Sequence, residues 1–551
     1  MKKRIIALLL VAVMALGLLV GCGKKKKVEN DGILRVGITQ LATISSYTEN
    51  DFTKWIEDQL GFKIEFVYYS SSGSEACQQF ALDCTANKID ELPDVMWGMQ
   101  EMSNYTLGDL GEDGYILDLA DYLNEEHFPN FMSALKDVPE KDKKTAMEKG
   151  VNPDDGGYYG MPLIALEHVD NVGDMMYINK EWLDKVGKDI PTTTEELYDV
   201  LKAFKEGDMN GNGDKNDEIP MLGNSVSGAG LVQYLMNAFI YWDSANIYNV
   251  LNGKVYSPIV QDQYRQGLQY IAKLYSEGLI GEMSFNGAPY TDFVNMNTPQ
   301  DQVAKVGIWT GHPSIYTDAN TTILDEYVAL PYLKDATGVG GYTVFHQNTI
   351  KWCSWIMSHT EESGKTEMAM KFLDLMYTDE AMTRMRFGAK DTYWHEGEEG
   401  LNIKGNPTKL YIDDDSAFFG GDSTWGRNGN CIMNDANYTG VEGDKVPGTR
   451  AAEVERIMKE TWVDVCGSGN PNKPAETAEY LVYSSEDYAI REAKHSRYWS
   501  YYSEAVNHFI VGERNINDDA DWAAYKTELE KLGQKELEGV AQRAYDRSIG
   551  K

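Results

Sequence analysis

Residues 33–97 combine two hydrophobic periods. Apolar residues alternate in Ile33 to Ile38 and again in 61–67, and a short apolar run follows in 92–97, which predicts three strands. In 50–60 and 74–86 the apolar positions recur every three or four residues, which predicts a helix between each pair of strands. This order indicates βαβ units around a parallel sheet, in which ligands bind at the carboxyl ends of the strands.

The rest of the chain continues the pattern and becomes rich in helices toward its C-terminus. Residues 175–179 predict another strand. The run from Thr192 to Glu196 has the character of a capping box, and the helix that it starts is expected to reach about Lys205. Further amphipathic helices are expected over 263–277, 361–377, 451–464, 486–510 and 521–547.

The N-terminus carries a targeting pattern. A basic head, Met1 to Arg4, precedes an apolar run from Ile5 to Val20, and Gly21 and Cys22 follow. This pattern resembles a bacterial lipoprotein signal peptide, in which Cys22 becomes the acylated N-terminus of the mature protein. The alternative is a transmembrane anchor, but the apolar run is shorter than the roughly 20 residues that a spanning helix needs. We therefore expect a protein on the extracytoplasmic face of the cell membrane, held there by its lipid only.

Residues 1–21 would then be the signal peptide and residues 22–31 a tether. The tether contains four lysines, Lys24 to Lys27. An anionic membrane surface would attract them. The alternative is that this segment is an ordinary solvated linker without a particular role.

Composition excludes some partners. The chain has 551 residues and a formal net charge of −35, and the signal peptide contributes only positive charges. Because phosphate binding needs basic surfaces, we expect no nucleic-acid partner. The sequence has neither a CxxC nor an HExxH motif, and its histidines are scattered without metal spacing. Cys77 and Cys84 lie in one predicted helix, about 10.5 Å apart in rise, which is too far for a disulfide.

Several short blocks follow one another along the mature chain. They are Leu92–Val95, Gly157–Pro162, Tyr177–Gly187, Pro191–Thr193, Leu274–Ile280, Lys371–Tyr377 and Phe509–Glu513. Each block is weak alone, but the series in this order resembles the family 1 extracellular solute-binding proteins of bacterial ABC importers. The branch of large lipoproteins that includes the alginate-binding proteins is most similar, and the maltose-binding protein is a more distant relative.

The resemblance implies a two-lobed α/β fold of the periplasmic-binding-protein type, with a hinge and a ligand cleft between the lobes. Mapped block by block, the N-lobe would comprise 32–165 and 347–385, and the C-lobe 166–346 and 386–551. The chain would cross between the lobes at three places, near Leu163 to His168, near His346 to Lys351 and near Phe387.

The acidic loop 208–218 resembles the opening of an EF-hand. Alternate side chains in a tight loop turn their oxygens toward one centre, and a glycine at position 6, Gly213, permits the turn. Position 12, which carries a glutamate ligand in an EF-hand, is Ile219 here. Asp217 and Glu218 would complete the coordination shell of the ion instead. The alginate-binding proteins carry a similar calcium loop, to which this chain adds one residue before Asp217. We expect one structural Ca²⁺ held by Asp208, Asn210, Asn212, Asp214, Asp217 and Glu218; the alternative is a turn without metal.

Aromatic residues are the main candidates for contacting a sugar, because aromatic rings suit the C–H faces of sugar rings. Trp97 follows a predicted strand of the first βαβ units, and Trp309 and Trp499 resemble stacking tryptophans of the maltose-binding protein. Trp394 and Trp425 lie in polar loops. For each ring the alternative is packing in a core. The full candidate set, with one carboxylate beside the first crossing, is Trp97, Glu167, Trp309, Trp394, Trp425 and Trp499.

The resemblance, together with the targeting pattern, implies a substrate-binding protein that performs no catalysis. It would capture an oligosaccharide by lobe closure and deliver it to the permease subunits of an ABC transporter. The alternatives are a surface glycoside hydrolase or lyase and a receptor for a non-sugar solute such as a peptide. Glycosidases need two carboxylates about 5–10 Å apart. A chain with 86 acidic residues always contains such a pair, so acidity does not favour an enzyme.

Overall fold

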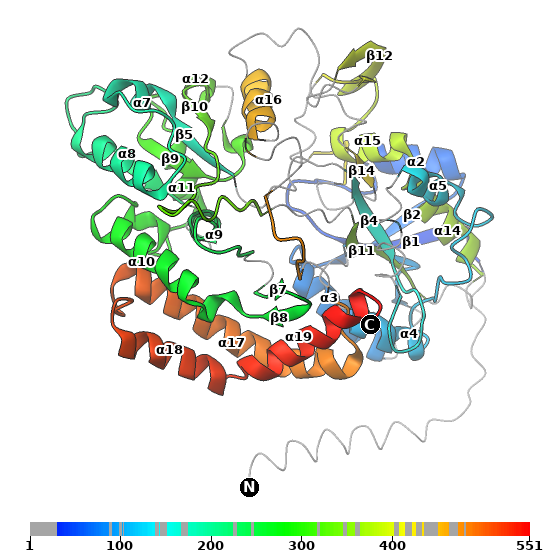
Figure 1. Cartoon of the computed structure of the whole chain (residues 1–551). Coiled ribbons are helices and arrows are strands. Elements are labelled where there is room, and N and C mark those ends of the chain that lie inside the picture. The colour runs from blue at the N-terminus through cyan, green and yellow to red at the C-terminus, as the bar shows by residue number, and fades with distance from the viewer. Residues whose placement is uncertain are drawn as a thin grey trace.

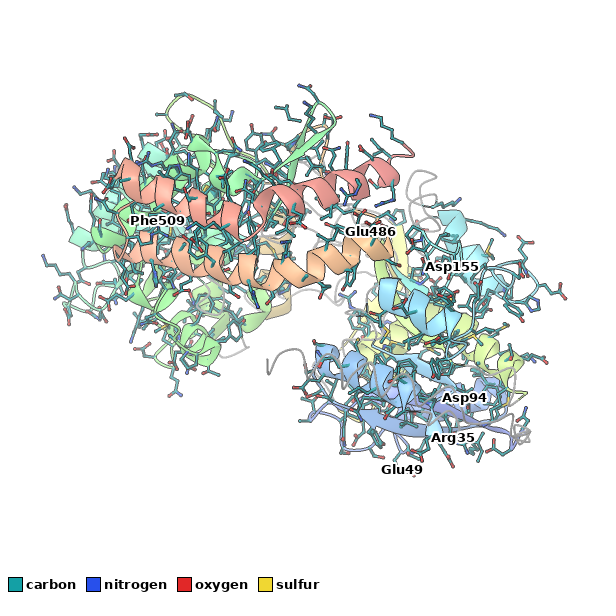
Figure 2. All side chains as sticks on the ribbon, turned by 90° about the horizontal axis from the view of Figure 1, so that it is seen from below. Arg35, Glu49, Asp94, Asp155, Glu486 and Phe509 are labelled. Carbon is teal, nitrogen blue, oxygen red and sulfur yellow. The ribbon has the colours of Figure 1, made fainter. Side chains whose placement is uncertain are left out.

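Two sheets, each with its own hydrophobic core, divide the molecule into two lobes. The protein is seen in a computed structural model, which describes residues 30–86, 91–98, 102, 104–137, 143, 151–166, 175–223, 229–243, 247–316, 320–344, 350–358, 364–401, 407–413, 421–425, 432–434, 450–461, 465, 472–478 and 481–551. The N-lobe, at the right of Figure 1, contains a six-stranded sheet, and the C-lobe, at the left, contains a four-stranded sheet. Figure 2 shows the two bodies from below.

The N-lobe starts with the predicted βαβαβ order. Strands β1 (Ile33–Thr39), β2 (Lys63–Tyr69) and β3 (Val95–Trp97) are parallel, and helices α2 (Asp51–Leu60) and α3 (Gly73–Thr85) connect them. The complete sheet has the order β14-β4-β11-β3-β1-β2, in which β11 is antiparallel to both its neighbours. The carboxyl ends of β1, β2 and β3 therefore meet at one edge, as the sequence predicts.

Further elements complete the N-lobe. Its remaining strands are β4 (Met161–Leu166), β11 (Ile350–Met357) and β14 (Ile432–Asn434). Its remaining helices are α4 (Asn104–Glu112), α5 (Pro129–Ala134), η3 (Leu135–Asp137), α14 (Thr366–Leu375) and α15 (Asp379–Phe387). A separate hairpin of β12 (Trp394–Leu401) and β13 (Pro407–Ile412) stands at the top of Figure 1.

The C-lobe has a smaller sheet surrounded by helices. Its strands follow the order β10-β5-β9-β6 and are β5 (Met176–Asn179), β6 (Ile219–Leu222), β9 (Val306–Thr310) and β10 (Tyr327–Ala329), with a hairpin of β7 (Asn249–Leu251) and β8 (Lys254–Tyr256). Its helices are α7 (Lys180–Val186), α8 (Thr194–Glu206), α9 (Ala229–Met236), η5 (Pro258–Val260), α10 (Asp262–Ser276), η6 (Glu282–Ser284), α11 (Tyr290–Asn297), η7 (Pro313–Ile315), α12 (Thr321–Asp325), α16 (Arg450–Glu460), α17 (Ser485–Val511), α18 (Asp519–Lys531) and α19 (Gln534–Ser548).

Local caps explain several helix boundaries. The predicted capping box at the start of α8 is present, since the Thr193 side chain accepts from the N–H of Glu196 and the Glu196 side chain accepts in return. One predicted boundary is wrong. Residues 521–547 were expected to form one helix, but α18 ends before α19 begins at Gln534, because Gly533 adopts φ +105°. Only glycine takes this conformation readily, so the chain turns there.

The lobe boundary differs from the expectation in the second half of the chain. The resemblance implies that the chain leaves the N-lobe near Phe387. However, Trp425 lies in the N-lobe core, and β14 is hydrogen-bonded to β4 of the N-lobe sheet. The described residues around Trp425 and in β14 therefore belong to the N-lobe, and α16, whose Ile457 packs in a C-lobe core, belongs to the C-lobe. A polar loop after a helix carries no local sign of which lobe receives it.

The placement of two cysteines on one helix is confirmed. Cys77 and Cys84 both lie on α3, as predicted, and both are buried. Among the residues that the structure describes, no helix combines the length and the apolar character needed to cross a membrane.

Candidate ligand and metal sites

The structure brings two of the candidate tryptophans together. Trp97 ends β3, and its ring centroid lies 5.8 Å from that of Trp425. Both side chains are fully buried in the N-lobe core. Phe52 and Phe66 contact Trp425 edge to face, and its Nε1 donates a 2.7 Å hydrogen bond to Thr53. This packing accounts for both rings, so a role in ligand stacking would require their neighbours to move.

Trp309 lies near the end of β9 in the C-lobe, inside a cage of tyrosines. Its ring centroid is 4.7 Å from that of Tyr177, 5.4 Å from Tyr316 and 6.1 Å from Tyr327. The side chain is fully buried, yet its indole Nε1 has no hydrogen-bond partner in the structure. A buried donor without a partner costs free energy. Because the tyrosines enclose Trp309 completely, a ligand oxygen would reach this N–H only if they moved aside.

The other candidates differ in exposure. Trp394 is buried, donates from Nε1 to the Gly388 carbonyl at 2.9 Å and carries the Lys390 ammonium over its ring. Trp499 on α17 is only partly buried and stacks on His495, whose pKa is lowered by burial. Glu167 lies outside the described residues. The roles of all six candidates in ligand binding stay predictions.

Sequence reasoning missed Thr39. This residue ends β1 at the edge where the carboxyl ends of the parallel strands meet. Its side chain is 3% exposed, and its Oγ1 has no hydrogen-bond partner in the structure. Gly98, just after β3, approaches it so closely that an added Cβ would lie 3.7 Å from Oγ1. The signal was available in the sequence, because a polar residue at the end of a predicted parallel strand is at the usual ligand edge.

The acidic loop brings side chains from its two ends together. Asn210 and Asn212 both direct their side-chain amides at the carboxylate of Asp217, at 3.3 and 2.8 Å. At the start of the loop, Asp208 accepts from the N–H groups of Gly211 and Gly213. The Oδ1 atoms of Asn210 and Asn212 accept from the N–H groups of Asn212 and Asp214, so the loop gathers oxygen-bearing side chains from both its ends.

The donor set of the loop fits Ca²⁺. The Oε1 of Glu218 accepts from the N–H groups of Met209 and Asn210, whereas its Oε2 is buried and has no partner. Carboxylate and amide oxygens are the ligands that Ca²⁺ prefers. One feature weighs against tight binding. Lys185 donates to the carbonyl of Asp208 at 2.8 Å, which places a positive charge beside the loop. Across the described residues, no group of three or more His, Cys, Asp or Glu side chains is arranged to hold a metal.

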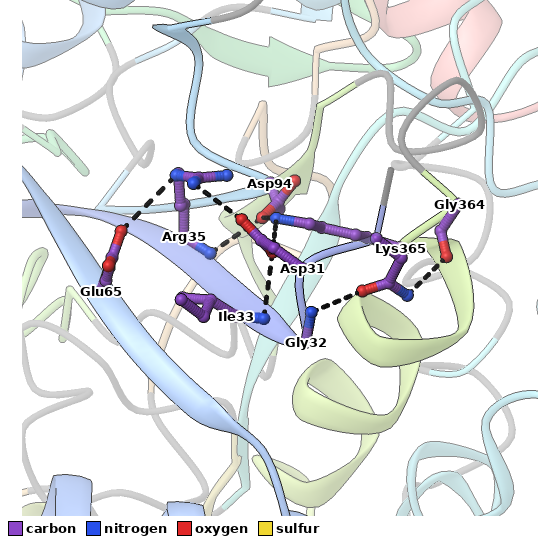
Figure 3. Close-up of polar contacts among 9 residues, drawn as sticks. Asp31, Gly32, Ile33, Arg35, Glu65, Asp94, Gly364 and Lys365 are labelled. Atoms are coloured by element: carbon purple, nitrogen blue, oxygen red, sulfur yellow. Dashed lines mark hydrogen bonds and ion pairs between the residues drawn. The ribbon is translucent and has the colours of Figure 1, made fainter. Parts of the chain in front are cut away.

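The start of the described chain is clamped to the N-lobe, as Figure 3 shows. Asp31 lies 2.9 Å from the ammonium of Lys365 and 2.9 Å from the guanidinium of Arg35. Lys365 is fully buried and also lies 3.4 Å from Asp94. Asn30 donates to the Gly364 carbonyl at 3.0 Å. The last two residues of the predicted tether, Asn30 and Asp31, are therefore held on the N-lobe.

The two carboxylates beside Lys365 differ in pKa. Burial favours a higher pKa for Asp31, but hydrogen bonds from Lys365 and the Ile33 amide outweigh it and lower the pKa to about 2. Burial raises the pKa of Asp94 despite its bonds to Arg35 and Lys365, because this side chain is much less exposed. The pKa values of the two carboxylates beside Lys365 are thus shifted in opposite directions.

Sequence comparison finds relatives along most of the chain. The profile of the bacterial extracellular solute-binding proteins matches residues 41–383. The fructooligosaccharide ABC transporter substrate-binding protein FusA of Streptococcus pneumoniae is 27% identical over 507 residues, which cover 89% of this chain and 86% of FusA. The lipoprotein LipO of Bacillus subtilis is 33% identical over 304 residues, which cover 52% of this chain and 56% of LipO.

Solved structures share the fold. An HMO-binding, ABC-transporter-associated solute-binding protein of Bifidobacterium longum infantis has a TM-score of 0.73 at 20% identity, with 93% of this chain and 98% of that chain covered. A FusA EF-hand mutant of S. pneumoniae, in complex with fructo-nystose, has a TM-score of 0.69 at 22% identity, with 94% and 99% covered. The two-lobed α/β fold that the sequence predicts is confirmed by these likenesses.

Proposed function

Since the chain belongs to the bacterial extracellular solute-binding proteins, we propose that it captures an oligosaccharide between its lobes and delivers it to an ABC permease. The observation that carries the choice of ligand is the likeness to FusA along 89% of the chain, since FusA is a fructooligosaccharide-binding component. The fold neighbour from B. longum infantis is likewise described as binding HMO. The relatives are binding proteins, which supports a protein without catalytic activity.

Two buried polar atoms support ligand binding at the strand ends. The Thr39 hydroxyl in the N-lobe and the Trp309 indole N–H in the C-lobe both lack partners. A sugar presents many hydroxyl groups, each of which donates and accepts hydrogen bonds. We therefore assign one direct hydrogen bond to each lobe, so that a bound sugar satisfies both atoms when the lobes close around it.

Calcium in this proposal is a structural ion. It would be held by the six oxygen-bearing side chains of the acidic loop, with Glu218 supplying its unpaired Oε2. The loop joins α8 to β6, so ion binding would stabilise this connection in the C-lobe. That a FusA variant is described as an EF-hand mutant supports the same kind of loop in this chain.

Membrane attachment in this proposal is through an acyl chain on Cys22. LipO, a lipoprotein by name, is a relative over part of the chain. Residues 22–29 span at most about 29 Å when fully extended. Because Asn30 and Asp31 are held by Gly364 and Lys365, the N-lobe would be the lobe that stays next to the membrane.

A glycan panel tests the proposed function. Purified residues 22–551 are titrated calorimetrically with fructooligosaccharides, human-milk-type oligosaccharides, pectic fragments and a mixed peptide pool. We expect saturable binding of at least one glycan class, with the glycan recovered intact by chromatography after incubation. Release of shorter products would indicate a glycoside hydrolase or lyase, and binding only to peptides would indicate a peptide receptor.

A further inference from the structure

A hydrogen-bonded contact joins the two lobes at the start of helix α17. The carboxylate Oδ2 of Asp154, in the N-lobe, accepts from the backbone N–H of Ser485 at 2.8 Å and also from the Ser485 hydroxyl. Ser485 is the first residue of α17, the 27-residue helix of the C-lobe. Figure 2 labels the adjacent residues Asp155 and Glu486, which lie next to one another where the two lobes meet.

Asp154 has a defined position on the N-lobe. Its own N–H donates to the Asn152 side chain at 2.8 Å, and the Gly156 N–H donates to the Asn152 carbonyl. The next residue, Asp155, accepts from the Tyr159 hydroxyl at 2.8 Å. Tyr159 is buried in an N-lobe core. The loop that carries Asp154 is therefore tied to the N-lobe by hydrogen bonds on both sides of it.

Ser485 has an equally defined position on the C-lobe. Asp487, two residues later, is buried and accepts from the Arg543 guanidinium at 2.8 Å, and it forms a 2.7 Å ion pair with Arg547. Burial favours a higher pKa for Asp487, but these two arginines outweigh it and lower the pKa. Both arginines belong to α19, and Arg547 also donates to Ser484, the N-cap of α17. The start of α17 thus cannot move independently of the C-lobe.

We propose that Asp154 is a positioning residue for ligand capture, whose carboxylate holds the α17 N-terminus and so favours the lobe arrangement of this structure. A hydrogen bond weakens steeply once donor and acceptor separate beyond about 3.5 Å. A relative movement of about 1 Å at this point therefore breaks the contact. The carboxylate is also attracted to the partial positive charge at a helix N-terminus.

The consequence for binding follows from population linkage. A protein whose lobes exchange between arrangements binds its ligand with an affinity scaled by the fraction in the competent arrangement. Asp154 touches no candidate ligand residue, so it acts on affinity only through this fraction. This part of the inference rests on the proposed function, whereas the lobe contact itself does not.

The experiment measures the lobe arrangement directly. Spin labels are placed on cysteines substituted for Leu82 in the N-lobe and Ile190 in the C-lobe, both of which are exposed. Pulsed electron resonance then gives the distribution of label-to-label distances without ligand. In Asp154→Ala we expect the population at the wild-type distance to fall roughly two- to fivefold relative to other distances, the fold-change that the loss of a net hydrogen bond supports. Asp154→Asn, which can still accept from Ser485, should restore the wild-type distribution.

The control is Asp155→Ala, which removes the bonds to Tyr159 and Gly157 inside the N-lobe but leaves the lobe contact. It should keep the wild-type distance distribution. A fructooligosaccharide titration of the same variants should show a changed affinity for Asp154→Ala alone. An unchanged distance distribution in Asp154→Ala, or an equal change in Asp155→Ala, overturns the inference. A shifted distribution with no glycan binding in any variant supports the contact and refutes the proposed function.

Discussion

The rings of Trp97 and Trp425 pack together in the N-lobe core at a centroid distance of 5.8 Å, although most of the chain separates them in sequence. Trp425 sits in a short segment that is bound to the start of α2. Asn50 donates from its side chain to the Thr424 carbonyl at 2.7 Å, and the Asp51 N–H donates to the Asp422 carbonyl at 2.8 Å. A segment from the second half of the chain thus completes the core of the first lobe.

We expect Trp425→Ala to lower the free energy of unfolding by about 3–5 kcal/mol, because it empties a fully buried site and leaves Thr53 without its donor. Urea denaturation measures the loss. The matched control is Trp55→Ala on α2, a partly buried ring that stacks on Phe52 and should cost less. A loss below about 1 kcal/mol for Trp425→Ala would show that this segment is not part of the core.

Trp309→Phe tests the unpaired indole N–H. The change keeps an aromatic ring but leaves a small cavity in a fully buried site, so it should lower the free energy of unfolding by about 1–3 kcal/mol. If the N–H meets a sugar oxygen, glycan affinity should fall by about 1 kcal/mol, or roughly fivefold. Calorimetry gives the affinity, and urea denaturation the stability.

Trp522→Phe on α18 is the control for this test, since Trp522 is also buried with an indole N–H that lacks a partner. Its replacement should leave glycan affinity unchanged. Equal affinity of Trp309→Phe and wild type would remove Trp309 from the ligand site and leave it as a packing residue.

Calcium removal should lower the melting temperature. An ion that binds only the folded state at 100 times its dissociation constant stabilises it by about 2.7 kcal/mol. Differential scanning calorimetry with and without a chelator measures the difference, which the double variant Asp208→Ala, Asp217→Ala should abolish. Asp199→Ala, an exposed carboxylate on α8, should respond to the chelator as wild type does. Identical melting with and without chelator, together with no calcium by elemental analysis, contradicts the proposed ion.

Lys365→Ala should lower the free energy of unfolding by about 3–5 kcal/mol at pH 7, because it leaves the buried carboxylate of Asp94 without its cation. Since burial already raises the pKa of Asp94, protonation relieves this penalty at low pH. The loss should therefore be smaller at pH 4 than at pH 7, as measured by urea denaturation at both values.

In the wild-type protein, the ion pairs of Asp31 should stabilise the fold less as the pH falls. The pKa of Asp31 is lowered from 3.8 to about 2, so its stabilising contribution is complete above pH 3.8 and is lost as the pH falls toward 2.

The control for Lys365→Ala is Lys371→Ala, which removes an exposed ion pair with Glu367 on α14. It should change the free energy of unfolding by no more than about 0.5 kcal/mol at pH 4 or pH 7. A pH-independent loss for Lys365→Ala would contradict the role of Asp94.

Local features were predictable because they depend on neighbours in the chain. Each of three features depends on only about a dozen neighbouring residues: the alternation in β1, the capping box of Thr193 and Glu196, and the acidic loop of 208–218. The family blocks are local as well, and their order was enough to predict a two-lobed solute-binding fold. Gly533 carried a local stop signal too, and the single helix expected over 521–547 overlooked it.

The sequence by itself determined most of the helices and strands, the family and the loop suited to calcium, whereas the tertiary structure decided which side chains are buried and which lobe each segment joins. Burial depends on packing between distant segments. The local sequence around a tryptophan in a polar stretch is therefore the same whether the ring fills a core, as that of Trp425 does, or lines a cleft. The contact between Asp154 and Ser485 has the same origin, since it exists only because two separately folded lobes place a loop and a helix start side by side.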